Sequence, residues 1–230
     1  MQKCVGKSLY ERRKPSKLNL IFNIIIIIFL FVIIGEVIFN SYYTSIYVKG
    51  ESMEPTLNGA PNTSVKLSGG DYLFVNKHAK PDYFDIVVVI TEDYNEEGEL
   101  VKYDIIKRVV AFGGDTVKID HGQLYIKYKG ESEFKEIEEP YLSEDKNKKE
   151  DAVNTFDEHV VADGCMFLLG DNRSNSKDSR ARGGKDYPMS DLVGVVPEWS
   201  LKYKSQITAI YTFFEFTLGF GGFGSKIYGN

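Results

Sequence analysis

The sequence predicts a mainly β protein, in which a single N-terminal transmembrane helix precedes a β-sandwich or barrel-like domain. Two observations support this prediction. Residues 18–39 are almost wholly Ile, Phe, Leu and Val, and a run of that length suits a helix that crosses a hydrocarbon layer of roughly 30 Å. Between residues 50 and 197 the chain has short β-type runs separated by turns and no long amphipathic helix, which favours a β architecture.

The N-terminal segment indicates how this helix is oriented. Residues 1–17 hold six bases and one acid, a net charge of +5. Positive charge beside a membrane span stays in the cytoplasm, so the chain from residue 40 onward is expected outside the cell membrane, with Tyr42, Tyr43 and Tyr47 as an aromatic belt. The alternative is a cleaved secretory signal. Such a signal has a shorter apolar region followed by small residues, which this chain lacks.

Seven short runs have the composition of strands. The run 84–90 is apolar on both faces and is therefore expected to be buried. The runs 116–119 and 123–128 flank Asp120-His121-Gly122, which is a good hairpin signal. The complete set is 72–76, 84–90, 104–112, 116–119, 123–128, 166–169 and 192–196.

Two polar segments interrupt these strands, and a tail follows them. Residues 92–102 and 144–158 are acidic or rich in lysine, so we expect solvated loops there. The outer domain is expected to span residues 40–205, followed by an aromatic and glycine-rich tail at 206–230. Glycines crowd the end of this tail, which argues against a second membrane span. The tail either lies at the membrane interface or packs on the domain.

Charge and cysteine content exclude several classes of function. The whole chain carries −5, and because residues 1–17 carry +5, the remainder carries −10. A domain this acidic is a poor candidate for binding nucleic acid. Cys4 and Cys165 fall on opposite sides of the predicted membrane, so they cannot pair within one chain. No Cys/His cluster has the spacing of a metal site, and we expect neither a metal nor a cofactor.

A serine with a proline three residues further on lies just outside the predicted span. The segment is Ser52-Met53-Glu54-Pro55-Thr56-Leu57. Pro55 has a fixed φ and biases Glu54 toward extended conformations, so the backbone at Ser52 is expected to form an open strand or a turn. A serine held in this way is a candidate nucleophile at the membrane surface.

Two bases interrupt the apolar strand 104–112. Strand side chains alternate, so Lys107 and Arg108 point to opposite faces, and one of them must enter apolar surroundings or a cleft. A guanidinium stays charged there, whereas burial lowers the pKa of a lysine from about 10.4 by up to several units. A neutral lysine can act as the general base for a serine hydroxyl. The alternative is a lysine that reaches toward solvent and pairs with a carboxylate.

The segment 170–180 is dense in hydrogen-bonding side chains and follows an apolar strand. Such density suits a loop that builds a preorganised polar site, and it also suits an ordinary surface turn. Within it Asp178 and Arg180 can pair, and Ser176 can orient an amine that acts as a base. A Ser-His-Asp arrangement is disfavoured, because none of the three histidines accompanies a motif.

Together these segments resemble the bacterial type I signal peptidases, which are membrane-bound Ser-Lys endopeptidases that remove signal peptides from exported proteins. The resemblance covers most of the chain. Its segments, in the family's order, are the N-terminal anchor, Gly50-Glu51-Ser52-Met53-Glu54-Pro55-Thr56-Leu57, Gly70-Asp71-Tyr72 with Asn76-Lys77, Phe84-Asp85-Ile86-Val87-Val88-Val89, Ile106-Lys107-Arg108-Val109-Val110 with Gly114-Asp115, and 170–180.

The resemblance implies roles for individual residues. Ser52 is the nucleophile and Lys107 the general base. Ser176 hydrogen-bonds to that lysine and positions it, and Asp178 and Arg180 support the site. Secretory preproteins are the implied substrates and membrane lipid the implied surroundings, while the residues that bind substrate and the oligomeric state remain unassigned.

One departure from the family bears on catalysis. The resemblance implies that the backbone N–H of Ser52 donates to the oxyanion, and some members add a serine hydroxyl two residues earlier, where this chain has Gly50. One such donor is worth about 3–4 kcal/mol in a transition state, so water or another backbone group would have to supply it here. The chain also departs from the family's sequence pattern at residues 83–85 and 111–115, which lie beside the catalytic residues.

Two other functions fit parts of the sequence. A self-cleaving Ser-Lys repressor shares the catalytic residue types, but such repressors are soluble, which the run 18–39 argues against. A membrane-anchored scaffold or peptide-binding protein without activity would not need Ser52, Lys107 and Ser176 together. Both alternatives are therefore less favoured than the peptidase.

Overall fold

The computed structural model describes residues 16–61, 69–94, 98–142, 155–218 and 225–228. The chain divides into two compact units, Met1–Ser41 and Tyr42–Asn230, which are described separately. Most of the basic N-terminal segment lies outside the described residues.

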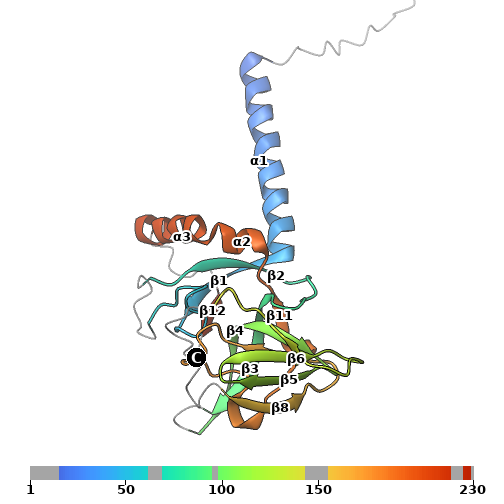
Figure 1. The fold of residues 1–230 in the computed structure, drawn as a ribbon. Helices are drawn as coiled ribbons and strands as arrows, with labels where there is room; N and C mark the ends of the chain where they lie inside the picture. Colours follow the sequence, from blue (N-terminus) through green and yellow to red (C-terminus); the bar gives the residue numbers. More distant parts are fainter. Residues whose placement is uncertain (1–15, 62–68, 95–97, 143–154, 219–224, 229–230) are drawn as a thin grey trace, which may run out of the picture. The chain divides into compact units, whose positions relative to one another are not determined.

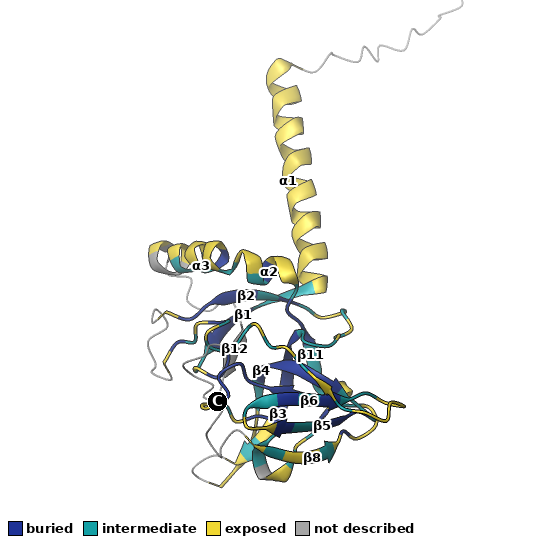
Figure 2. Cartoon of the chain, in the orientation of Figure 1, coloured by how far each residue is buried: buried dark blue, intermediate teal, exposed yellow. Residues whose placement is uncertain are grey.

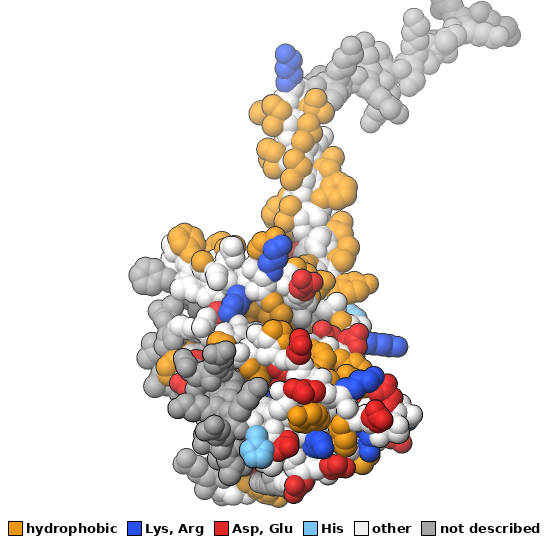
Figure 3. Space-filling model, viewed as in Figure 1, with side chains coloured by type: hydrophobic (Ala, Val, Ile, Leu, Met, Phe, Trp, Pro, Cys, Tyr) orange, Lys and Arg blue, Asp and Glu red, His pale blue; other side chains and the backbone are white. Residues whose placement is uncertain are grey.

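The first unit holds one long helix, α1 (Lys17–Tyr42) (Figure 1). Its 26 residues are about 39 Å long, and its most apolar window has a mean hydropathy of 3.0. None of its residues is buried, and apolar side chains cover it (Figures 2 and 3). A helix that is apolar all round requires apolar surroundings. Among the described residues, α1 alone has the length and composition to cross a bilayer.

The second unit contains two β-sheets. The larger has eight strands in the order β10-β9-β4-β3-β11-β2-β1-β12, and the smaller has four in the order β7-β6-β5-β8. All pairs are antiparallel except β1 with β12, which is parallel. The strands are β1 (Tyr43–Lys49), β2 (Tyr72–Asn76), β3 (Ile86–Tyr94), β4 (Leu100–Phe112), β5 (Thr116–Asp120), β6 (Gln123–Lys127), β7 (Lys135–Glu136), β8 (Phe156–Val160), β9 (Cys165–Leu169), β10 (Tyr187–Pro188), β11 (Leu192–Val195) and β12 (Ser225–Tyr228).

The larger sheet curls, because its edge strand β12 lies against β4, which is the third strand from the other edge. The space inside this curl is filled by apolar side chains of the strands around it, among them Ile46, Leu73, Val88 and Ile106. β-branched residues favour strands, and a strand that is covered on both faces has apolar residues on both. The mainly β, barrel-like domain predicted from the sequence is therefore confirmed.

A second core joins the two sheets. Phe167 and Leu169 of β9 pack with Val117 of β5 and Leu124 and Ile126 of β6, and all five are fully buried. Strand β4 contributes to the core inside the curl, to this second core and to a third one around Val87 and Val109. A long strand shared by three cores is a rigid place for a functional side chain.

Each of the seven predicted runs forms a strand, with bounds that differ by a few residues. The prediction of a loop at 92–102 is wrong for residues 92–94 and 100–102, because β3 extends to Tyr94 and β4 begins at Leu100. This end of the hairpin is largely exposed, and Lys102 pairs with Glu92 across it at 2.7 Å. Its strands therefore lack the apolar pattern of buried ones.

The second predicted loop, 144–158, also contains a strand. β8 begins at Phe156 and pairs as an edge strand with β5, and its side chains are mostly exposed. Residues 144–154 lie outside the described residues. The predicted aromatic belt is wrong for Tyr47, which is a β1 residue buried against Tyr72.

Two helices follow β11. They are α2 (Glu198–Lys202) and α3 (Lys204–Leu218). The ring of Tyr211 stacks on Tyr72 with centroids 4.8 Å apart, and Thr208 Oγ1 accepts a hydrogen bond from the Tyr72 N–H at 2.8 Å. The first part of the predicted tail therefore packs on β2.

Candidate active site

Ser52 lies in a turn-rich loop that connects β1 to β2. The loop is held at its base by a hydrogen bond from the Gly50 N–H to the Ala60 carbonyl at 2.9 Å. Met53 and Leu57 are buried in the core inside the curl. The Ser52 carbonyl accepts a hydrogen bond from the Asn172 N–H at 2.9 Å. Core packing and backbone hydrogen bonds thus fix the serine in a turn, which is one of the two conformations that the sequence predicted.

Lys107 of β4 points at this serine. Its Nζ lies 2.7 Å from Ser52 Oγ and 3.0 Å from the Ile106 carbonyl oxygen. Lys107 is 0% exposed and Ser52 is 1% exposed. The alternative of a lysine that reaches toward solvent is therefore wrong.

Burial changes the acid–base properties of this lysine. Loss of solvation lowers the pKa of Lys107 to about 8, although the negative charges of Asp178 and Asp171 act in the opposite direction. A pKa of about 8 leaves roughly a tenth of the amine neutral at pH 7. In the neutral form Nζ has a lone pair, and the 2.7 Å separation lets it accept the Ser52 hydroxyl proton.

Arg108, the second base of the strand, is also buried, so both faces of β4 are covered at this point. Its guanidinium binds Asp171 through two hydrogen bonds, Nε to Oδ1 at 2.9 Å and Nη2 to Oδ2 at 2.6 Å. It also donates to the Phe84 carbonyl and lies over the Tyr141 ring. The sequence left open which base enters the interior. Both do, because a paired guanidinium can remain charged there.

Asp171 connects three parts of the site. Besides Arg108, it accepts a hydrogen bond from the Thr56 hydroxyl at 2.5 Å. Thr56 belongs to the Ser52 loop, and Asp171 belongs to the 170–180 segment. Through its hydrogen bonds to Thr56 and Arg108, Asp171 therefore ties the serine loop to β4, the strand that carries Lys107.

Asp178 and Arg180 pair as predicted. Arg180 donates from Nε to Oδ1 at 2.8 Å and from Nη2 to Oδ2 at 2.9 Å. The Gly170 N–H donates to the same carboxylate at 3.0 Å. Burial alone would raise the pKa of Asp178, but the hydrogen bonds and charge of Arg180 and the Gly170 N–H hold it below its usual value. Asp178 is therefore ionised.

Ser176 does not hydrogen-bond to Lys107 among the described residues. The Ser176 Oγ is buried and makes no hydrogen bond to any described residue, although it lies close enough to Asp178 to help lower the pKa of that carboxylate. It lies beside Gly170, where an added Cβ would meet Ser176 Oγ at 2.2 Å and the Ser52 carbonyl oxygen at 2.5 Å. Ser176 is thus next to the serine loop without the hydrogen bond that the resemblance implied.

The structure therefore brings Ser52 and Lys107 into direct contact. Asp178 acts on Lys107 through its charge, and Arg180 acts on Asp178. Sequence reasoning missed the pairing of Arg108 with Asp171 and the role of Thr56 in it. The one available signal was an arginine in an apolar strand, which requires a carboxylate partner.

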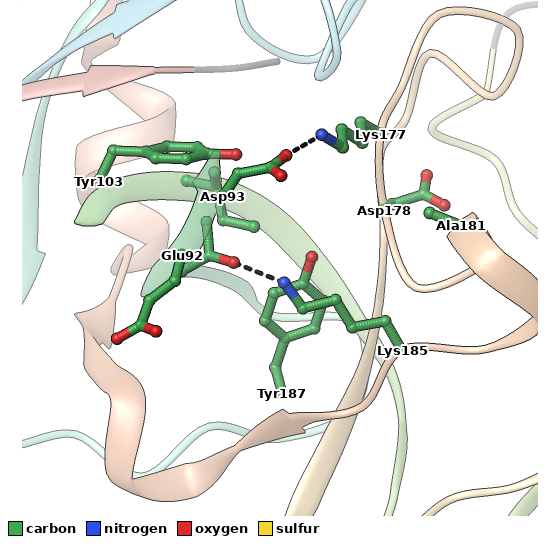
Figure 4. Close-up of a pocket in the computed structure, with 10 residues that line it drawn as sticks. Glu92, Asp93, Tyr103, Lys177, Asp178, Ala181, Lys185 and Tyr187 are labelled. Carbon is green, nitrogen blue, oxygen red and sulfur yellow. Dashed lines mark hydrogen bonds and ion pairs between the residues drawn. The ribbon is translucent and has the colours of Figure 1, made fainter. Parts of the chain in front are cut away.

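The pocket in Figure 4 lies between β3, β4 and the segment 177–187, and Asp178 is one of the residues that line it. Lys177 pairs with Asp93 in it, and Lys185 donates to Thr91 Oγ1 at 2.7 Å. Its volume of about 50 Å³ holds a few water molecules, which is too little for a peptide. In the part of the chain that the structure describes, no group of three or more His, Cys, Asp or Glu side chains could hold a metal ion.

The fold and this buried serine–lysine pair are those expected of a β-rich serine hydrolase. Residues 19–201 match the family model "Signal peptidase, peptidase S26". The chain belongs to this family, because the match covers most of its length.

Related proteins agree with the family. The chain is 32% identical over 176 residues to a signal peptidase I of Bacillus amyloliquefaciens, with 74% of this chain and 83% of the relative covered. It is 34% identical over 179 residues to signal peptidase I S of Bacillus subtilis strain 168, with 76% and 84% covered. The chain also matches the crystal structure of a signal peptidase I from Enterococcus faecalis V583, with 27% sequence identity and a TM-score of 0.36. This match covers 52% of this chain and 98% of that chain.

Proposed function

We propose that this protein is a membrane-anchored serine endopeptidase that removes N-terminal signal peptides from exported preproteins with a Ser52–Lys107 dyad. The observation that carries the proposal is the 2.7 Å contact between Ser52 Oγ and a buried Lys107 Nζ whose pKa is lowered to about 8. Family membership supports the substrate class, since its relatives are signal peptidases I.

The chemistry follows from these two side chains. Neutral Lys107 takes the hydroxyl proton as Ser52 Oγ attacks the carbonyl carbon of the scissile bond. Lys107 then returns the proton to the leaving amine as the C–N bond breaks, which leaves an acyl-enzyme. Water hydrolyses this ester, and Lys107 again moves the proton. Arg108, Asp171 and Thr56 hold the serine loop against β4, so that the reacting groups stay in register.

The oxyanion requires donors near Ser52. No hydrogen bond from the Ser52 N–H is found among the described residues, which leaves it free to serve as one donor. Gly50 carries no hydroxyl and has a φ of 78°, a conformation that suits glycine. Residue 50 therefore cannot supply the second donor from a side chain, and a water molecule or another backbone N–H supplies it.

Membrane anchoring forms the second part of the proposal. Helix α1 spans the bilayer with the basic N-terminus in the cytoplasm and the catalytic domain outside. Trp199 of α2 packs against Tyr43, the first residue of β1 after α1, with ring centroids 5.7 Å apart. On α3, Ile210, Phe213 and Phe214 are exposed, as expected of a surface that contacts lipid. Anchoring raises the local concentration of membrane-inserted preproteins.

Substitution of the dyad tests the proposal. Ser52→Ala and Lys107→Ala should each abolish cleavage of a purified preprotein in detergent, because each removes one of the two groups that react. Tryptophan fluorescence reports whether the fold is intact. Turnover near that of the unmodified enzyme in either folded variant would refute the dyad. Exposed Ser174 provides the control, and Ser174→Ala should cleave normally.

A further inference from the structure

The strand that leads to Ser52 is paired along its outer edge with a segment from the far end of the sequence. β12 runs parallel to β1, with Ile46 opposite Ser225 and Lys49 opposite Tyr228. Ser52 follows Lys49 by three residues, so both strands run toward the serine loop. Figure 1 shows β12 beside β1.

β12 also lies against β4, the strand that carries Lys107. One edge of β4 pairs with β3 over its whole length up to Arg108, but the other edge pairs with β9 only from Arg108 onward. The stretch of β4 that ends at Lys107 therefore has no β9 partner. β12 thus lies between β1, the strand that leads to Ser52, and the edge of β4 ahead of Lys107 that pairs with no strand among the described residues.

We propose that residues 225–228 act as a built-in competitor of the substrate, because they occupy the strand position through which an extended peptide reaches Ser52. This inference rests on the proposed function. A peptide that adds a strand to a sheet is held mainly by backbone hydrogen bonds, so a segment of the chain itself can use the same donors and acceptors of β1.

The direction and register of β12 suit this role. A strand advances about 3.3 Å per residue, so a peptide in the β12 register draws level with Ser52 about three residues beyond the position of Tyr228. The bond to be cleaved lies at that level. A substrate and β12 cannot both pair with the same edge of β1, and substrate binding requires β12 to leave.

The expected kinetic consequence is a raised KM. The apparent affinity of a site is reduced by the fraction of molecules in which it is open. A segment that closes the position about nine-tenths of the time raises KM about tenfold and leaves kcat unchanged, because the bound substrate meets the same Ser52 and Lys107. A tethered segment reaches such occupancy readily, since its effective concentration is on the order of millimolar.

A truncated enzyme tests the inference. The variant that ends at Leu218 keeps α3 and lacks β12. Against a preprotein in lipid nanodiscs, it should show a KM several-fold lower than the full chain, with the same kcat. A synthetic peptide of residues 223–230 should restore the higher KM as a competitive inhibitor, and a scrambled peptide of the same composition should not.

A second experiment keeps the full chain. In a background with Cys4→Ser and Cys165→Ser, the pair Lys49→Cys with Tyr228→Cys joins residues that lie opposite each other. Oxidation should form a disulfide, because opposed residues of paired strands have suitable spacing. It should block cleavage, which a reductant restores. The control is Lys49→Cys with Ser225→Cys, three positions out of register, which should not cross-link.

The outcomes separate the two proposals. Equal KM values for the full and truncated chains, or full activity of the oxidised Lys49→Cys/Tyr228→Cys enzyme, would overturn the competitor role while leaving the peptidase intact. A higher KM in the truncated enzyme would also overturn it, because the segment would then assist binding. Loss of cleavage by the unmodified full chain and the truncated enzyme alike would instead count against the proposed function.

Discussion

The pH dependence of cleavage follows from the burial of Lys107. The proposed reaction needs the neutral amine of Lys107, and loss of solvation lowers the pKa of this amine to about 8. A lowered lysine pKa means that the charged, inactive form dominates below pH 8 and the neutral form dominates above it. We therefore expect kcat/KM to rise with pH and then level off.

The size of the effect can be worked out from this pKa. With a value of about 8, the neutral fraction is roughly 1% at pH 6, 9% at pH 7 and 90% at pH 9. The rate constant kcat/KM should thus increase roughly 90-fold between pH 6 and pH 9. A solvated lysine with a pKa of about 10.4 would give roughly a thousandfold increase over the same range and no plateau.

An internally quenched peptide substrate with the enzyme in detergent micelles provides the assay. The parameter to follow is kcat/KM, because it reports the pKa of the free enzyme. Fluorescence of Trp199, the only tryptophan, shows over which pH range the fold persists. A profile that is flat from pH 5 to 9, or one that climbs to pH 10 without levelling, would refute the assignment of Lys107 as a buried base.

Three further predictions concern the surroundings of the dyad and the membrane. Ser176→Ala should lower kcat far more than it changes KM if this buried hydroxyl orients the Lys107 amine during proton transfer; a raised KM with unchanged kcat would place Ser176 in the substrate cleft instead, and exposed Ser174→Ala is the matched control. Arg180→Gln should shift the acidic limb of the pH profile to higher pH, because Asp178 loses its partner and its charge raises the pKa of Lys107; exposed Lys202→Gln should leave the limb in place. In nanodiscs with brominated lipid acyl chains, Trp199 fluorescence should be strongly quenched if α2 and α3 lie on the bilayer. Equal Trp199 fluorescence in brominated and unbrominated nanodiscs would refute the contact.

The sequence predicted strands where burial leaves a compositional pattern and missed them where it does not. The run at β3 is apolar on both faces because cores lie on both sides of it. The edge strand β8 is mostly exposed, so its composition resembles a solvated loop. Tyr47 of β1 was assigned to a membrane interface and is buried in the protein instead, because local composition cannot distinguish lipid from a protein core as the apolar environment of an aromatic ring.

Within the site, the sequence predicted that Ser52 and Lys107 belong together, and they are in contact, but it did not predict the contacts that position them. The Arg108–Asp171 pair joins residues 63 positions apart, and nothing local to either segment specifies the other. Ser176 was assigned a hydrogen bond through the resemblance, and its hydroxyl has none among the described residues. Such contacts depend on the placement of loops by tertiary packing, which periodicity and turn signals do not encode.

The balance of charge around Lys107 explains why this buried amine can be neutral near physiological pH. Two carboxylates, Asp171 and Asp178, lie close enough to raise its pKa. Each of them is bound through two hydrogen bonds by its own arginine, Arg108 and Arg180. Because each negative charge is paired, its attraction for the ammonium form is weakened, and the loss of solvation prevails. The two arginines thus keep the site polar and ordered while the pKa of Lys107 stays lowered, as the proposed role of this lysine as a base requires.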